Sequence, residues 1–167
     1  MTSNMLTVAE VIRADKTRVA VSGPHRGKIN KAKFPLRKTK VFPQSPDWCW
    51  WTIDFVAINR RFVCLVRLNQ QTEVYSAILG FFDQEQLRVV CHHEHHTSHG
   101  GLHCHLAHGD VSDLPGVLRD KTRFRKRGWG AKSVKDQKSE ITPVDAVAVA
   151  LKRYRILDMT PVEGGLL

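Results

Sequence analysis

Five runs rich in aromatic and β-branched residues follow one another between Trp48 and Leu106, with short polar breaks between them. Runs of this composition are typical of β-strands. Breaks this short connect antiparallel neighbours, because a parallel crossover needs a dozen residues or more. The sequence therefore predicts a five-stranded antiparallel meander, with strands at 48–58, 61–68, 72–82, 86–96 and 102–106.

Two helices are expected beside this meander. Thr7 and Glu10 form a capping-box pattern that predicts a short N-terminal helix over residues 8–15. Thr142 and Pro143, followed by an acid in the first turn, predict the start of a C-terminal helix. Its apolar positions at helical spacing should pack on the sheet. They are Val144, Val147, Ala148, Leu151 and Tyr154. The predicted fold class is α+β, with both helices packing on the meander.

The 167 residues fit one domain, so a single domain over 1–167 is expected. No apolar run is long enough for a membrane span, and the first residues lack the pattern of a secretory signal. The four cysteines include no CxxC pair, which favours reduced thiols. A cytoplasmic protein without a membrane partner is therefore expected.

The net charge of +10 is concentrated in two segments. Residues 16–40 hold nine Lys and Arg and no acid, and residues 119–138 hold nine against two acids. We expect a basic flexible arm over 17–40 and a basic loop over 119–138. In the loop, cations and an aromatic ring alternate, as they do where phosphates and unpaired bases are bound. The candidate nucleic-acid-binding residues are Arg119, Arg123, Arg125, Lys126, Arg127 and Trp129. RNA or a single strand is favoured over duplex DNA. The alternative is a solvated loop.

Eight of the nine histidines fall between His92 and His108, on the predicted hairpin of strands 86–96 and 102–106. Successive residues of a strand point to opposite faces. If Leu87, Val89 and the apolar set of the second strand face the core, one polar group shares the other face. That group is His92, Glu94, His96, His103 and His105. Val90 fits this arrangement poorly, and a one-residue shift in register would bring His93 and His95 to that face instead.

Opposed side chains on adjacent strands are close enough to share an ion. We therefore predict a divalent metal, with zinc as the expected ion, bound by His96, His103 and His105, with Glu94 beside it as ligand or base. The catalytic set is Glu94, His96, His103 and His105. Together with the basic loop, it predicts a metal-dependent nuclease or phosphodiesterase. Two alternatives stay open: a metal-free endoribonuclease with two histidines as acid and base, and a zinc-stabilised module that binds nucleic acid without cutting it. A His-rich loop that binds metal only adventitiously is the plainest reading.

Overall fold

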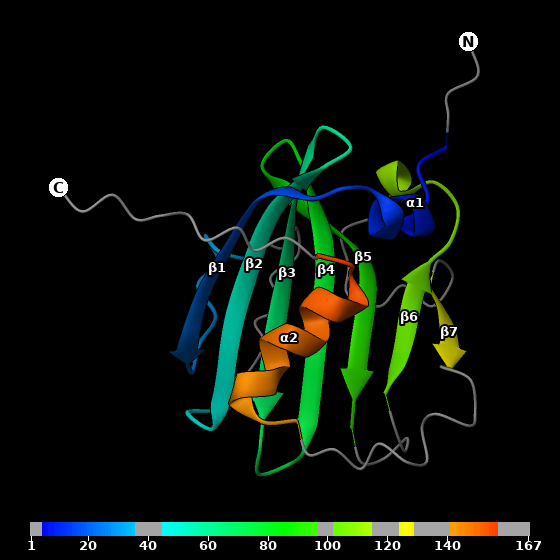
Figure 1. The fold of residues 1–167 in the computed structure, drawn as a ribbon. Coiled ribbons are helices and arrows are strands. Elements are labelled where there is room, and N and C mark those ends of the chain that lie inside the picture. Colours follow the sequence, from blue (N-terminus) through cyan, green and yellow to red (C-terminus); the bar gives the residue numbers. More distant parts are fainter. Residues whose placement is uncertain (1–4, 36–44, 97–101, 115–123, 129–140, 157–167) are drawn as a thin grey trace, which may run out of the picture.

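The computed structural model describes residues 5–35, 45–96, 102–114, 124–128 and 141–156. Its centre is one sheet of seven strands, in which every strand pairs antiparallel with its neighbours in chain order (Figure 1). The strands are β1 (Thr17–Arg26), β2 (Trp48–Ala57), β3 (Arg60–Asn69), β4 (Val74–Asp83), β5 (Gln86–His95), β6 (His103–Ala107) and β7 (Phe124–Gly128). The α+β class and the antiparallel meander are confirmed, and the five predicted strands lie within two residues of β2–β6.

The predicted count of five strands is wrong, because β1 and β7 extend the meander at its two edges. They form in the segments expected to be a basic arm and a basic loop. The edge of a sheet offers unpaired N–H and C=O groups, which an adjacent segment can satisfy whatever its side chains. No residue of β1 is buried, so its sequence carries no alternating apolar signal. The prediction of a single domain stays a prediction.

Both predicted helices form: α1 (Val8–Arg13) and α2 (Pro143–Arg153). The Thr7–Glu10 capping box closes the start of α1, and Thr142 caps α2 with Pro143 in its first turn. A 3-10 turn, η2 (Val111–Asp113), follows β6, and its Val111 N–H donates to the Leu6 carbonyl oxygen. This hydrogen bond connects the segment that precedes α1 to the segment that follows β6.

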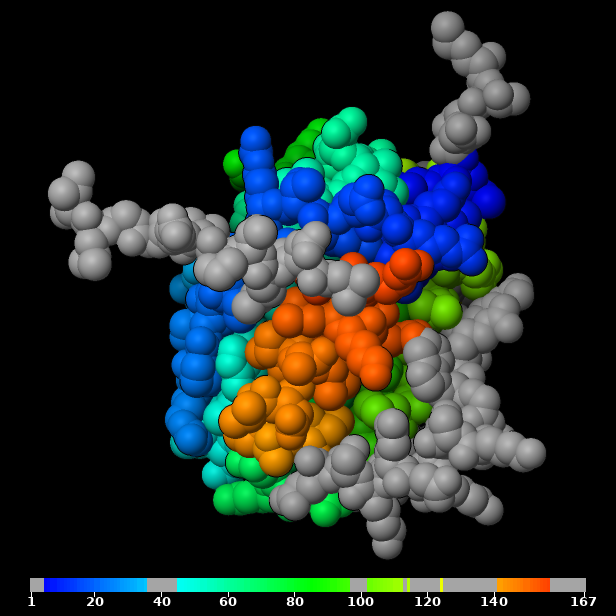
Figure 2. All heavy atoms as spheres, viewed as in Figure 1, coloured from blue at the N-terminus to red at the C-terminus, as the bar shows by residue number. Residues whose placement is uncertain are grey.

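Helix α2 lies across one face of the sheet, as the ribbon and the space-filling view both show (Figures 1 and 2). Two tyrosine hydroxyls fix it there. Tyr75 of β4 donates to the Ala146 carbonyl oxygen at 3.3 Å, and Tyr154 donates to the Ala77 carbonyl oxygen at 2.7 Å. We call this the helix face of the sheet, and the other the open-site face.

The predicted stripe of α2 is confirmed in part: Tyr154 is buried and Val147 and Leu151 pack against the core, but Ala148 is exposed. Ala146, Ala150 and Tyr154 are fully buried, whereas Val144 is 87% exposed. Two small residues and one aromatic ring let the helix approach the sheet closely, and the valine at the first turn points to solvent. This helix is rich in alanine and valine, so apolar residues at helical spacing occur on more than one of its faces. Only packing against the sheet decides which of these faces is buried.

Candidate metal centre

The hairpin of β5 and β6 places its histidines in a defined register. His92 pairs with His105, and Glu94 pairs with His103. Directly opposed residues project to the same face of a sheet. All four side chains therefore share the open-site face, as predicted.

The placement of the apolar residues of β5 differs from the prediction, because this strand contains a β-bulge. Leu79 of β4 pairs with Cys91, but the next residue, Gly80, pairs with Val89, which leaves Val90 without a partner. A bulge of this kind inserts one residue and shifts the alternation of side chains. Leu87 and Val89 consequently lie on the same face as Glu94, not on the opposite face as expected.

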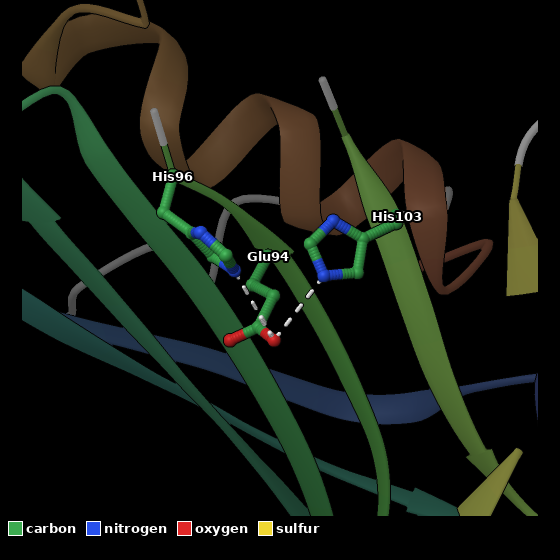
Figure 3. A group of neighbouring side chains, drawn as sticks. All are labelled: Glu94, His96 and His103. Atoms are coloured by element: carbon green, nitrogen blue, oxygen red, sulfur yellow. Dashed lines mark ion pairs between the residues drawn. The ribbon is translucent and has the colours of Figure 1, made fainter. Parts of the chain in front are cut away.

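Four imidazoles surround the Glu94 carboxylate. The Nε2 atoms of His105, His103 and His96 lie 3.0, 3.3 and 3.9 Å from Oε1, and Nε2 of His92 lies 3.2 Å from Oε2. The carboxylate is 7% exposed, and His96 and His105 are partly exposed at 21% and 22%. Figure 3 shows His96 and His103 directed at Glu94 from two sides. The site is therefore a buried carboxylate contacted by four imidazoles, two of which are partly exposed to solvent.

Glu94, His96 and His103 could hold a metal ion, since one ligand atom from each lies within 4.8 Å of the other two. Ligand atoms bound tetrahedrally at about 2.1 Å are about 3.4 Å apart. The separations of 3.3 and 3.9 Å from Glu94 Oε1 are near that value, and the ligand atoms of the two histidines lie within 4.8 Å of each other. The predicted ligands were His96, His103 and His105. In the structure, Glu94 takes the place of His105 in the group that could hold the ion, and His105 contacts Glu94.

His93 and His95 lie outside this centre. His93 pairs with Cys104 on the helix face, where its ring meets Tyr75 edge-on. Burial and, to a smaller extent, the charge of Arg153 lower the pKa of His93 to about 3, so this imidazole is neutral at pH 7. The Nδ1 atom of His95 donates to the Glu73 carbonyl oxygen at 2.9 Å. Strand alternation thus divides the histidines of β5 between two faces.

Two polar residues that the sequence analysis did not select connect to the centre. The Ser76 hydroxyl lies 2.9 Å from Nε2 of His92, and Nη2 of Arg67 donates to that hydroxyl at 3.3 Å. A sequence signal was available for Arg67, since it is a charged residue late in the apolar run that forms β3. Ser76 had no comparable signal, because a serine is ordinary in a strand.

The candidate nucleic-acid-binding residues are only partly placed. Arg119, Arg123 and Trp129 lie outside the described residues. The backbone of Arg125, Lys126 and Arg127 forms β7, where Lys126 pairs with His105. The basic segment therefore runs directly beside the strand that supplies two histidines of the cluster.

Comparisons with protein-family models, with curated proteins and with solved structures gave no match. Within the described part of the chain, the helices are too short or too polar to cross a membrane.

Proposed function

We propose that the protein is a metal-dependent phosphodiesterase that cleaves nucleic acid, with RNA or a single strand as the favoured substrate. The observation that carries this proposal is the convergence of histidine Nε2 atoms on one buried carboxylate at Glu94. Imidazole and carboxylate donors suit zinc, which is the ion we expect. The basic strand β7 beside β6 supports a polyanionic substrate.

Each residue of the cluster has a role in this proposal. Glu94, His96 and His103 hold the ion, which supplies Lewis acidity to a phosphate oxygen and lowers the pKa of water. Hydrolysis forms a bond from the water oxygen to phosphorus and breaks the bond to the leaving oxygen. His105, partly exposed beside the ligands, accepts the proton of the attacking water. The leaving oxygen takes a proton from solvent.

A second candidate is a nucleic-acid-binding module in which zinc only stabilises the hairpin. The observation in its favour is that His105 is as close to Glu94 as the two histidine ligands are. If His105 also binds the ion, four protein ligands close the site, as is usual for structural zinc. Such a site has no position for a reacting water.

The deciding experiment measures cleavage of labelled RNA, single-stranded DNA and duplex DNA by the full chain, with added zinc or with a chelator. We expect cleavage that needs the metal and that is lost in Glu94→Gln and His103→Ala. His95→Ala is the matched control, because His95 lies on the same strand but contacts the Glu73 carbonyl. Cleavage indifferent to the chelator would instead indicate the metal-free histidine pair, and binding without cleavage the zinc-stabilised module.

A further inference from the structure

A row of directly paired polar residues leads from β3 to the metal centre. Arg67 of β3 pairs with Ser76 of β4, and Ser76 pairs with Glu94 of β5. Directly paired residues project to the same face of a sheet, so these three side chains lie on the open-site face. The proposed function uses Glu94 but gives no role to Arg67 or Ser76.

His92 connects this row to the Glu94 carboxylate. Nη2 of Arg67 donates to the Ser76 hydroxyl oxygen at 3.3 Å, and that oxygen lies 2.9 Å from Nε2 of His92. The same Nε2 lies 3.2 Å from Oε2 of Glu94. Ser76, His92 and Glu94 are all buried, so bulk water does not compete for these contacts. We call Arg67, Ser76 and His92 the support chain.

The donors and acceptors of the support chain determine where its protons lie. A guanidinium only donates and a carboxylate only accepts, so the Ser76 oxygen accepts from Arg67. Because Nε2 of His92 faces both a carboxylate oxygen and the Ser76 oxygen, it carries a proton directed at them. A ring nitrogen that carries a proton has no lone pair for a metal ion. His92 therefore contacts Glu94 as a hydrogen-bond donor.

The two oxygens of Glu94 have different surroundings. Oε2 is contacted by His92, whereas the Nε2 atoms of His103 and His96 lie 3.3 and 3.9 Å from Oε1. Among the residues that the structure describes, the group that could hold an ion is Glu94 with these last two histidines, and His92 is not a member of it. One oxygen is held by the support chain, and the other faces the ligand histidines.

We propose that Arg67, Ser76 and His92 are positioning residues, which hold Glu94 so that only Oε1 reaches the ion. The inference rests on the metal site of the proposed function, but it requires neither nucleic acid nor cleavage. A group that hydrogen-bonds to a metal ligand keeps that ligand oriented, and its loss typically weakens metal binding about 10- to 100-fold. The support chain therefore sets the affinity of the site without contacting the ion.

The test measures the affinity of the full chain for zinc, by competition with a chromophoric chelator. We expect Ser76→Ala to weaken binding about two- to tenfold, because one hydrogen bond of the support chain is lost. His92→Ala should weaken it about 10- to 100-fold. His92→Gln, whose amide still donates to Glu94, should recover most of that loss. Ser22→Ala is the matched control, because the Ser22 hydroxyl also lies 3.0 Å from a histidine Nε2, that of His25 on β1.

A second measurement separates a positioning residue from a ligand. The visible absorption of bound cobalt(II) depends on the number and kind of its ligands. With cobalt in excess, the spectrum of His92→Ala should match that of the wild type, whereas the spectrum of His103→Ala should differ. Melting curves of the metal-free variants establish that each is folded at the temperature of the titration.

The outcomes separate this inference from the proposed function. Wild-type affinity in folded Ser76→Ala and His92→Ala, or a cobalt spectrum that changes in His92→Ala as it does in His103→Ala, would overturn the support chain. If that happens while metal-dependent cleavage is present, the proposed function stands without it. If the affinities change as expected but no nucleic acid is cleaved, the support chain stands and the proposed function is wrong.

Discussion

Glu94 is the residue around which the metal centre is built, because four histidines lie within 4 Å of its carboxylate. Three of them approach one oxygen, Oε1, so their Nε2 atoms already surround a small volume. A buried carboxylate is costly unless it is paired, and the imidazoles supply that pairing.

Replacing a ligand of this group should abolish tight metal binding. We expect His103→Ala to weaken zinc binding by more than about 100-fold, since even partners that only orient a ligand contribute 10- to 100-fold. Competition with a chromophoric chelator measures the affinity. His95→Ala should bind zinc as the wild type does, and an equal loss in both variants would show that zinc binds elsewhere in the histidine-rich hairpin.

The face shared by Glu94, His103 and His105 was predictable from the sequence, whereas the contact of Ser76 with this group was not. Histidines at 103 and 105 alternate with apolar residues, so strand periodicity alone puts them on one face. Ser76 of β4 lies opposite Glu94 of β5, and the bulge at Val90 changes the register that the short turn between these strands would otherwise give. Their proximity is a property of the sheet.

Among the elements, β5 decides which side chains reach the metal centre. The bulge at Val90 puts His92 and Glu94 on the open-site face while Leu87 and Val89 occupy that face too. If Val90 were paired regularly instead of bulged, the alternation would run unbroken through all of β5, and one of these pairs would have to change faces.

Deleting Val90 should therefore leave the metal site in place. Val89 and Cys91 would become neighbours opposite Gly80 and Leu79, which are neighbours already, so Leu87 and Glu94 would both stay on the open-site face. We expect the deletion variant to bind zinc as the wild type does. Zinc affinity and the melting temperature are the measurements. Val90→Ala keeps the backbone length and should bind zinc normally despite a lower melting temperature. Loss of zinc binding in the deletion variant, with a melting temperature close to that of Val90→Ala, would contradict this account of how β5 pairs with β4.

Over the whole molecule, α2 is joined to the sheet by the only two tyrosines in the sequence, Tyr75 and Tyr154. Burial raises the pKa of each well above its ordinary value of 10. Above that pH the unfolded chain releases protons that the folded chain retains. These groups therefore stabilise the fold fully below about pH 10, and their contribution is lost as the pH rises.

The Tyr154→Phe variant should show a weaker dependence of stability on alkaline pH. At pH 8 it should be less stable than the wild type by about 1 kcal/mol, because the bond to the Ala77 carbonyl is lost. Above pH 10 its unfolding free energy should fall less steeply, by up to about 1.4 kcal/mol per pH unit. Urea unfolding at pH 8 and pH 10.5 measures both effects. Parallel losses in the two proteins would contradict the assignment.

The sequence by itself determined the strands from Trp48 to Ala107, their antiparallel connection, both helix starts and the polar character of the hairpin. These features depend on local periodicity, short breaks and capping residues, which act within a few positions along the chain. The tertiary structure decided the bulge at Val90, the two edge strands, the face of α2 and the contact of Ser76 with His92. Each of these is a choice between pairings of similar local energy, and only packing and backbone hydrogen bonding across the whole sheet select one of them.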